Sequence, residues 1–270
     1  MRRFEVGGGD IVPLPEGSTI TVSVVIPTLN EADNLPHVLP RIPKWVHEVV
    51  MIDGGSTDGT AEVAKELWPG VIVVQDLTPG KGAALRRGFE VATGDIIVMI
   101  DADGSMDPGE IRAFVGALIG GADFAKGSRF CHGGGTADME WYRKMGNAVL
   151  TRMVRLAFGG RYSDLCYGYN AFWKQTIHSL DLQADGFEIE TLMNIRALRA
   201  NLIISEVPSF EAKRIHGTSN LNTVKDGWRV VRTIFRERYT TPFEVGSVTI
   251  DLRSDAIDHS ETGDVRSLAG

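Results

Sequence analysis

The chain has 270 residues, of which 43% are hydrophobic and 23% are charged, and its formal net charge at pH 7 is −7. This length and composition are typical of a soluble globular protein with one large α/β domain, and the acidic balance argues against a general nucleic-acid binder. Two cysteines, Cys131 and Cys166, form neither a metal-binding spacing nor a disulfide framework, which indicates a reducing, cytoplasmic environment.

The first half of the chain alternates between predicted strands and helices. Residues 1–19 carry glycines and prolines without periodicity, so we expect a flexible leader and no signal peptide. Apolar and β-branched runs predict strands at 21–26, 48–52, 71–74 and 96–100, and helical spacing predicts helices at 35–39, 61–67 and 81–92. Short βαβ units of this kind predict an α/β fold, with a mostly parallel sheet and helices on both faces.

The second half continues with longer elements. We expect helices at 111–118, 139–158 and 186–199, strands at 122–125 and 202–207, a strand and loop at 165–172, and a mobile glycine-rich loop at 131–138. The acidic stretch 245–270 lacks periodicity and predicts a disordered tail. No apolar run is long enough to span a bilayer, so we expect any contact with a membrane to be peripheral.

Two carboxylates end the strand predicted at 96–100. Asp101 and Asp103 lie one residue apart, and on extended backbone such positions point to the same side. Because two like charges this close need a cation between them, the pair predicts a divalent-metal site. The alternative is a simple turn with Asp101 solvated. Asp107 is kept out of the site because Asp107, Pro108 and Glu110 have the pattern of a helix N-terminus closed by a capping box.

Three segments that follow predicted strands carry polar or irregular sequence. They are residues 27–31, Asp53 with the glycines after it, and residues 101–103. In an open parallel sheet, ligands bind in the crevice outside the carboxyl ends of the strands. The three segments therefore predict a binding site at one edge of the sheet.

Five motifs, in order, give a resemblance to a known family. They are Pro27-Thr28-Leu29-Asn30-Glu31, Asp53-Gly54-Gly55-Ser56-Thr57-Asp58-Gly59-Thr60, Gly80-Lys81-Gly82, Gly94-Asp95 and Asp101-Ala102-Asp103. Over residues 20–240 the chain resembles a family 2 glycosyltransferase of the GT-A fold. Within that family it is most similar to the polyprenyl-phosphate sugar transferases, such as the dolichol-phosphate mannosyltransferases, and the segments 127–130 and 214–221 also resemble motifs of that branch. The resemblance implies a single Rossmann-like catalytic domain, with a nucleotide-sugar half at 20–130 and an acceptor half at 131–240.

The resemblance implies that a nucleotide-sugar donor binds at the strand ends. The implied donor-binding residues are Pro27, Leu29, Glu31, Asp53, Lys81, Asp101, Ala102 and Asp103. Asp101 and Asp103 would hold Mg²⁺ or Mn²⁺, which neutralises the departing diphosphate. Other interpretations stay open for three of these residues: Glu31 as a helix-start residue, Asp53 as a turn former and Lys81 as a solvated charge.

The acceptor half carries candidate phosphate ligands and bases. Arg129 and Arg214 join the acidic pair as catalytic candidates, because a guanidinium holds phosphate through paired hydrogen bonds, although each also fits an ordinary structural arginine. A lipid-phosphate acceptor is already an anion and needs little help from a base. A hydroxyl acceptor requires one, and Asp164 and Glu188 are the candidates.

The implied reaction is a single inverting displacement that moves a hexose from GDP-mannose or a UDP-hexose to a polyprenyl-phosphate-type acceptor. The first alternative is a family 2 transferase acting on a hydroxyl of a soluble glycan or small molecule. A nucleotidyltransferase is less favoured, because such enzymes usually place a glycine-rich basic loop after the first strand. A non-catalytic nucleotide-sugar-binding protein is the remaining alternative, and the sequence predicts no oligomeric state.

A basic segment near the C-terminus bears on the acceptor. Its spacing predicts a helix with a basic face and a neighbouring apolar stripe, formed by Lys225, Arg229, Arg232 and Arg236 and by Val224, Trp228, Val231 and Phe235. This combination suits an anionic membrane surface, so residues 224–236 predict peripheral contact with the inner face of a membrane. The alternative is a helix packed on the domain with a solvated basic face.

Overall fold

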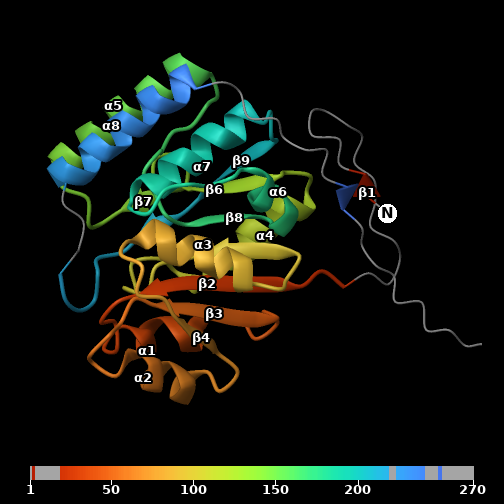
Figure 1. Cartoon of the computed structure of the whole chain (residues 1–270), viewed down its shortest axis with the longest axis vertical. Coiled ribbons are helices and arrows are strands. Elements are labelled where there is room, and N and C mark those ends of the chain that lie inside the picture. The colour runs from red at the N-terminus through yellow and green to blue at the C-terminus, as the bar shows by residue number, and fades with distance from the viewer. Residues whose placement is uncertain (1, 4–18, 219–222, 241–248, 251–270) are drawn as a thin grey trace, which may run out of the picture.

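One seven-stranded sheet forms the centre of the computed structural model, which describes residues 2–3, 19–218, 223–240 and 249–250 (Figure 1). Its strands are β2 (Val22–Thr28), β3 (Glu48–Asp53), β4 (Ile72–Gln75), β5 (Ile96–Met99), β6 (Phe124–Ser128), β8 (Asn170–Trp173) and β9 (Ile204–Pro208). Their order across the sheet is β4-β3-β2-β5-β8-β6-β9. The central strands β3 and β5 are buried on both faces, which explains the unbroken apolar runs that predicted them.

The strands run parallel to their neighbours except for β8. This strand pairs antiparallel with β5 on one side and with β6 on the other. The predicted mostly parallel sheet is therefore confirmed. The strand and loop expected at 165–172 resolve into a loop followed by β8, which joins the two halves of the sheet.

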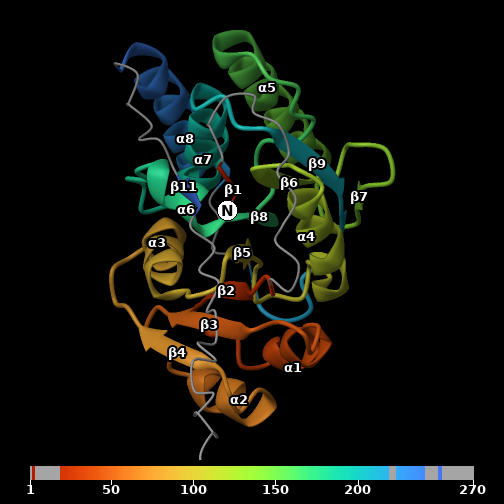
Figure 2. The same cartoon turned by 90° about the vertical axis from the view of Figure 1, so that its right-hand side faces the viewer.

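Helices cover both faces of the sheet, as predicted (Figure 2). They are α1 (Leu35–Val38), α2 (Thr60–Leu67), α3 (Lys81–Val91), α4 (Ile111–Ile119), α5 (Trp141–Phe158), α6 (Lys174–Ser179), α7 (Glu188–Arg199) and α8 (Thr223–Tyr239), with the 3₁₀ turns η1 (Leu39–Arg41) and η2 (Pro108–Glu110). The core on one face is filled from α1, α2 and α4. The core on the other face is filled from α3, α6 and α7.

The long helices α5 and α8 form an outer layer at one end of the molecule. They contact each other and α7; α8 lies in front of α5 in Figure 1, and Figure 2 shows the two helices apart. A third apolar cluster joins this layer to α7 through Val154 of α5, Ile195 of α7, and Val230 and Ile234 of α8. The end of the molecule farthest from this layer carries β4 and α2.

Two short strand pairs lie outside the main sheet. β7 (Gly135–Thr136) pairs in parallel with β10 (Phe210–Glu211), so part of the loop expected to be mobile at 131–138 is held by this ladder. β1 (Arg2–Arg3) pairs antiparallel with β11 (Thr249–Ile250), which involves two residues of the expected leader and two of the expected tail. The other residues of the leader up to 18, and residues 245–248 and 251–270 of the tail, lie outside the described residues.

Two local predictions were wrong. Pro27 was expected to end the first strand, yet β2 continues through it to Thr28, because β2 has already passed its last residue paired with β5 and needs no donor on that side. Asp107 caps η2, with its side chain accepting from the amide of Gly109, but Glu110 does not complete a capping box. Its carboxylate instead accepts from the amide of Phe210 at 3.1 Å.

Candidate active site

The carboxyl ends of β2, β3 and β5 bring the predicted segments to one edge of the sheet. Thr28 at the end of β2 stands opposite Asp53 at the end of β3. β5 ends at Met99, and the chain then turns at 101–104 rather than continuing as a strand. The extended-backbone argument for placing Asp101 and Asp103 side by side was therefore wrong, and their positions follow from the turn.

Asp101 is held by a lysine from α3. Nζ of Lys81 lies 2.6 Å from Oδ1 of Asp101 and 2.8 Å from Oε1 of Glu190 on α7. Burial raises the pKa of Asp101 to about 6, with the Lys81 charge opposing that rise and the Asp103 charge adding to it. Burial alone would lower the pKa of Lys81, but the two carboxylates raise it well above its ordinary value, so Lys81 remains an ammonium ion. The solvated-charge interpretation of Lys81 is thereby excluded.

Asp103 forms an ion pair with an arginine from the C-terminal part of the chain. Nη1 of Arg214 lies 3.3 Å from Oδ2 of Asp103, and its other terminal nitrogen pairs with Glu31. Oδ1 of Asp103 accepts a 2.9 Å hydrogen bond from the amide of Ser105. Asn34 donates to Glu31 at 2.6 Å. Arg214 thus joins the β2 end of the site to the acidic turn.

The segment 212–217 lies directly on the acidic turn. The amide of Ile215 donates to the carbonyl of Asp103 at 3.2 Å, and the amide of Ala212 donates to the carbonyl of Ser105 at 2.8 Å. Gly104 between them has a φ of +77°, and a Cβ there would lie 2.5 Å from Cδ1 of Ile215. Only glycine fits both the left-handed backbone and this close approach.

The donor groups at this turn fit Mg²⁺ or Mn²⁺. Asp101 and Asp103 are partly exposed hard-oxygen ligands, and the contribution of Asp103 to the raised pKa of Asp101 shows that the two charges repel. Among the described residues, no group of three or more histidine, cysteine, aspartate or glutamate side chains gathers as a metal cage. One or two carboxylates completed by phosphate oxygens and water is the usual arrangement for Mg²⁺ at a nucleotide site.

Some of the residues expected to bind the nucleotide-sugar donor have partners within the protein. Asp53 is buried, and its carboxylate accepts from the amide of Ser56 at 3.2 Å, which is the turn-forming alternative from the sequence. Glu31 is buried beside Arg214 rather than standing at a solvated helix start. Leu29 is exposed and Pro27 half-buried, so both offer apolar surface at the end of β2. Ala102 is buried beneath the acidic turn.

Arg129 and Asp164 form a buried ion pair that does not include the carboxylates of the acidic turn. Nε and Nη2 of Arg129 donate to the two carboxylate oxygens of Asp164 at 2.7 and 2.9 Å, and Nη1 donates to Glu211 at 2.9 Å. The Arg129 side chain is 3% exposed and that of Asp164 is 0% exposed. Burial raises the pKa of Asp164, but the Arg129 guanidinium outweighs it and holds that pKa below its usual value. This geometry supports neither Arg129 as a phosphate ligand nor Asp164 as a base.

Glu188 remains as a candidate base at the start of α7. Its Oε1 accepts from the amide of Gly186 at 3.3 Å. Its Oε2 is buried and has no hydrogen-bond partner among the described residues.

Sequence reasoning missed the partners that hold the site together. Glu190 holds Lys81, and Asn34 links Glu31 to the backbone of His216 at 3.2 Å. Both contacts join residues more than 100 positions apart, so no spacing signals them. Lys126 was also missed: its side chain is buried, donates to the carbonyls of Gly127 and Tyr167, and has a pKa lowered by burial.

Comparisons with known sequences agree with this geometry. The family model for "Glycosyl transferase family 2" matches residues 23–181. Glycosyltransferase AglJ of Haloferax volcanii is 30% identical over 88% of this chain and 78% of its own length. The dolichol-phosphate mannosyltransferase of Pyrococcus furiosus is 33% identical over 80% of this chain, which spans 63% of that protein. The polyprenol monophosphomannose synthase of Mycolicibacterium smegmatis is 32% identical over 81% of this chain and 87% of its own length.

Solved structures show the same fold. Glucosyl-3-phosphoglycerate synthase from Mycobacterium tuberculosis, in complex with Mn²⁺, UDP-glucose and phosphoglyceric acid, aligns with a TM-score of 0.62 and 26% identity over 81% of this chain and 80% of that chain. The complex of that enzyme with phosphoglyceric acid gives a TM-score of 0.64 and 26% identity over the same shares.

Proposed function

The chain belongs to glycosyltransferase family 2, and from that membership we propose that it moves a hexose, with inversion, from GDP-mannose or a UDP-hexose to a polyprenyl-phosphate-type acceptor. The fold is that of the GT-A glycosyltransferases, as expected. A nucleotidyltransferase is not retained as an alternative, because the matching family model describes glycosyl transfer. No helix among the described residues is both long and apolar enough to cross a membrane.

The proposed nucleotide-sugar binding rests on the positively and negatively charged side chains that lie together at the acidic turn. Lys81 and Arg214 flank Asp101 and Asp103, and all four side chains are only partly buried. Glu190 and Glu31 also pair with these two cations, so carboxylates outnumber cations at the site, which suits a divalent ion bound together with a diphosphate. Bound Mg²⁺ or Mn²⁺ would supply neutralisation of charge on the leaving diphosphate.

Each residue of the site then has a role that its position supports. Lys81 holds Asp101 as a carboxylate at neutral pH and adds positive charge near the diphosphate. Arg214 contributes a second positive charge from the segment that lies over the acidic turn. Leu29 and Pro27 offer an apolar wall to the base, and Glu31 and Asp53 stand at the strand ends where ribose and base donors would meet a carboxylate.

The buried Arg129–Asp164 pair favours a phosphate acceptor. Asp164, one of the two bases expected for a hydroxyl acceptor, is neutralised by Arg129 and fully buried. A phosphate acceptor is an anion at neutral pH and attacks without a base. Two of the relatives are named as a dolichol-phosphate mannosyltransferase and a polyprenol monophosphomannose synthase, which supports that class of acceptor.

A hydroxyl acceptor is the second candidate, and two observations favour it. Oε2 of Glu188 is buried without a partner among the described residues. Two of the structural neighbours are complexes that contain phosphoglyceric acid. If Glu188→Gln abolishes transfer while leaving donor binding intact, a base is required and the hydroxyl acceptor replaces the lipid phosphate.

Nucleotide binding tests the donor side. We would measure thermal stability with GDP, UDP, dTDP or CDP, each with and without Mn²⁺. A ligand at about 100 times its dissociation constant adds about 2.7 kcal/mol to the free energy of unfolding. We expect one nucleotide to stabilise the protein only with Mn²⁺, and Asp103→Asn to lose that effect.

Asp107→Asn is the matched control, because it makes the same change four residues along, where asparagine also caps a helix well. Equal loss of stabilisation in both variants, or no response to any nucleotide, would contradict the assignment of the acidic turn. Transfer to polyprenyl phosphate and to 3-phosphoglycerate, measured side by side, then separates the two acceptor classes.

A further inference from the structure

The outer faces of α5 and α8 gather exposed apolar side chains. Seventeen large hydrophobic side chains are exposed in the described part of the chain, and nine of them lie on these two helices. They are Trp141, Tyr142, Met145, Val149 and Leu156 on α5, and Val224, Trp228, Phe235 and Tyr239 on α8. Exposed apolar surface concentrated on neighbouring elements marks an interaction site.

On α8 the apolar stripe faces away from the protein. Val230 and Ile234 pack beneath the helix, whereas the side chains of Trp228 and Tyr239 are 69% and 81% exposed. The helix therefore packs on the domain and also presents the stripe that the sequence predicted. Both acidic residues of α8, Asp226 and Glu237, are buried, so the exposed charge on this helix is entirely basic.

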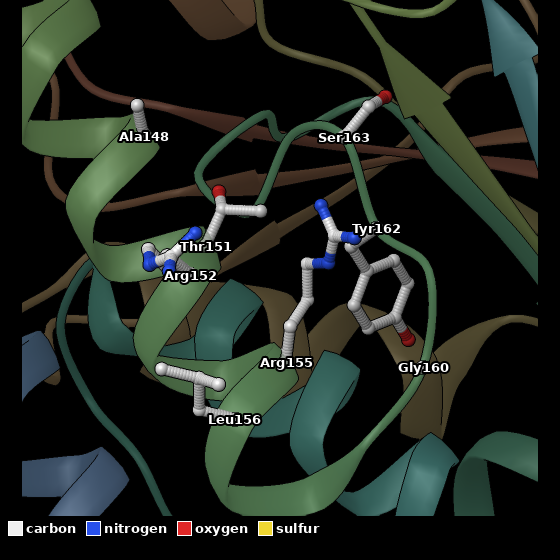
Figure 3. Close-up of a pocket in the computed structure, with 8 residues that line it drawn as sticks. All are labelled: Ala148, Thr151, Arg152, Arg155, Leu156, Gly160, Tyr162 and Ser163. Carbon is white, nitrogen blue, oxygen red and sulfur yellow. The ribbon is translucent and has the colours of Figure 1, made fainter.

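On α5, basic and exposed apolar side chains also lie together, beside a pocket (Figure 3). The pocket, of about 620 Å³, opens between α5 and residues 160–163, and Arg152, Arg155 and the exposed Leu156 line it. Arg155 reaches from the helix toward the segment that carries Tyr162 and Ser163. Neither arginine forms an ion pair within the described residues. Apolar and cationic side chains thus alternate along this helix as well.

The basic face of α8 borders the candidate active site. A Cβ on Gly186 would lie 2.8 Å from Nη1 of Arg229, so the two residues are in contact range. The carbonyl of the preceding residue, Asp185, accepts from the amide of Gly82 at 2.8 Å. Gly82 follows Lys81, which contacts Asp101. A surface held against α8 would therefore lie next to the loop that supports the reacting groups.

We propose that the outer face of the α5–α8 pair docks on an anionic lipid bilayer. The exposed tryptophans and aliphatic side chains enter the interface, and the basic residues of both helices face the lipid headgroups. The whole chain has a net charge of −7, so this basic face is a local exception that matches an anionic partner. A second copy of the chain is disfavoured as the occupant, because a symmetric contact would oppose two basic faces.

Docking at this face would bring a lipid-phosphate acceptor to the active site. That consequence rests on the proposed function, whereas docking itself does not. Vesicle flotation measures docking without donor or transfer. Nucleotide-dependent thermal stability, measured without vesicles, tests the donor site separately. Failure of one measurement therefore does not imply failure of the other.

The experiment compares vesicles of phosphatidylcholine alone with vesicles in which about one third of the lipid is phosphatidylglycerol. We expect the whole chain to float only with the anionic vesicles and to dissociate as salt is raised. Each basic residue at such a surface contributes about fivefold to partitioning, so Lys225→Glu with Arg232→Glu should weaken binding by about 25-fold or more. We expect Trp141→Ser with Trp228→Ser to remove most quenching of tryptophan fluorescence by brominated lipid.

The matched controls carry the same changes on other surfaces. Lys65→Glu with Arg112→Glu alters exposed charges on α2 and α4, and Trp45→Ser alters a tryptophan near α1 that is 46% exposed. These variants should float like the unaltered chain. Equal binding to neutral and anionic vesicles, or an equal loss in the controls, would overturn the proposal. Self-association that the Trp141 and Trp228 substitutions abolish would also overturn it, by identifying a second copy as the occupant.

Discussion

At the scale of single residues, the three cations singled out from the sequence differ in how completely carboxylates enclose them. Arg129 has a side chain that is 3% exposed, and all three of its guanidinium nitrogens are bonded to carboxylates. Arg214 and Lys81 keep 18% and 12% of their side chains exposed at the acidic turn. Arg214 is also bonded on all three guanidinium nitrogens, so its exposure at the acidic turn, rather than a lack of partners, distinguishes it from Arg129.

Removing the charge of Asp164 tests the structural role of Arg129. Asp164→Asn leaves a buried guanidinium with one carboxylate partner, Glu211, and we expect it to lower the free energy of unfolding by about 3 kcal/mol near neutral pH. The pKa of Asp164 is lowered in the folded protein, so the unfolded chain binds protons first as the pH falls. This stabilisation is present above the ordinary carboxyl pKa of about 4 and is lost progressively below it. Urea unfolding over a pH series would measure the difference between the two proteins.

The pH series also distinguishes this role from a simple packing effect. We expect the difference between the unaltered chain and Asp164→Asn to shrink as the pH drops below about 4. Asp138→Asn, at an exposed position of the same charge, should show little difference at any pH. A difference for Asp164→Asn that stays constant into acid would contradict the ion-pair account.

At the scale of elements, the start of α3 shows how a backbone contact places a charged side chain. The amide of Gly82 donates to the carbonyl of Asp185, and a Cβ on Gly82 would lie 2.4 Å from the carbonyl oxygen of Ala184. Gly82 of the sequence motif Gly80-Lys81-Gly82 therefore allows α3 and the segment 184–186 to approach closely. That approach sets Lys81 between Asp101 and Glu190.

Two glycine-to-alanine substitutions should have opposite effects on stability. In Gly82→Ala the added methyl group meets rigid backbone, so we expect the free energy of unfolding to fall by about 1–3 kcal/mol, the usual cost of overpacking. In Gly116→Ala on α4 the added Cβ meets nothing within 4 Å, so we expect a gain of up to about 1 kcal/mol from helix propensity. Denaturant unfolding of both variants would measure this. A gain in both would show that segment 184–186 yields easily to α3.

Most strands and long helices could be predicted because their signals are local. β3 and β5 are unbroken apolar runs, and α4 has a clear apolar periodicity. Features that depend on distant neighbours could not be predicted. Pro27 is tolerated in β2 because β2 has passed its last residue paired with β5, and no local pattern sets the antiparallel direction of β8. The six-residue helix α6 carries too short a pattern to recognise.

At the scale of the whole molecule, the candidate site could be located from the sequence but not assembled. Topology brings the ends of β2, β3 and β5 together, so the motifs that follow these strands were expected to meet. The resemblance added Lys81 and Arg214 to this site, but it did not predict that Lys81 pairs with Glu190 of α7 or that Arg214 pairs with Asp103. Ion pairs between distant elements leave no periodic trace in a sequence, which is why Asp164 was expected to be a base when it is buried against Arg129.

The outer layer is attached to the rest of the molecule by a buried carboxylate. Glu237 near the end of α8 is 3% exposed. Nη2 of Arg196 lies 3.1 Å from one of its oxygens, and Nη1 of Arg199 lies 2.9 Å from the other. Both arginines belong to α7, so this cluster links α8 to the helix that also carries Glu188 and Glu190. Apolar contacts of Val230 and Ile234 supply the rest of the attachment.

Glu237→Gln should therefore loosen α8 without unfolding the sheet. Removal of one partner from a buried ion pair costs about 3–5 kcal/mol, which is a large share of the stability of a single element. Hydrogen–deuterium exchange read by mass spectrometry should show faster exchange in α8, with protection unchanged in β2, β3 and β5. Glu62→Gln, on the exposed face of α2, controls for the chemical change and should leave the exchange pattern intact. Equal loss of protection in α8 and in the sheet would contradict the prediction, because it would show that the outer layer and the core unfold as one unit.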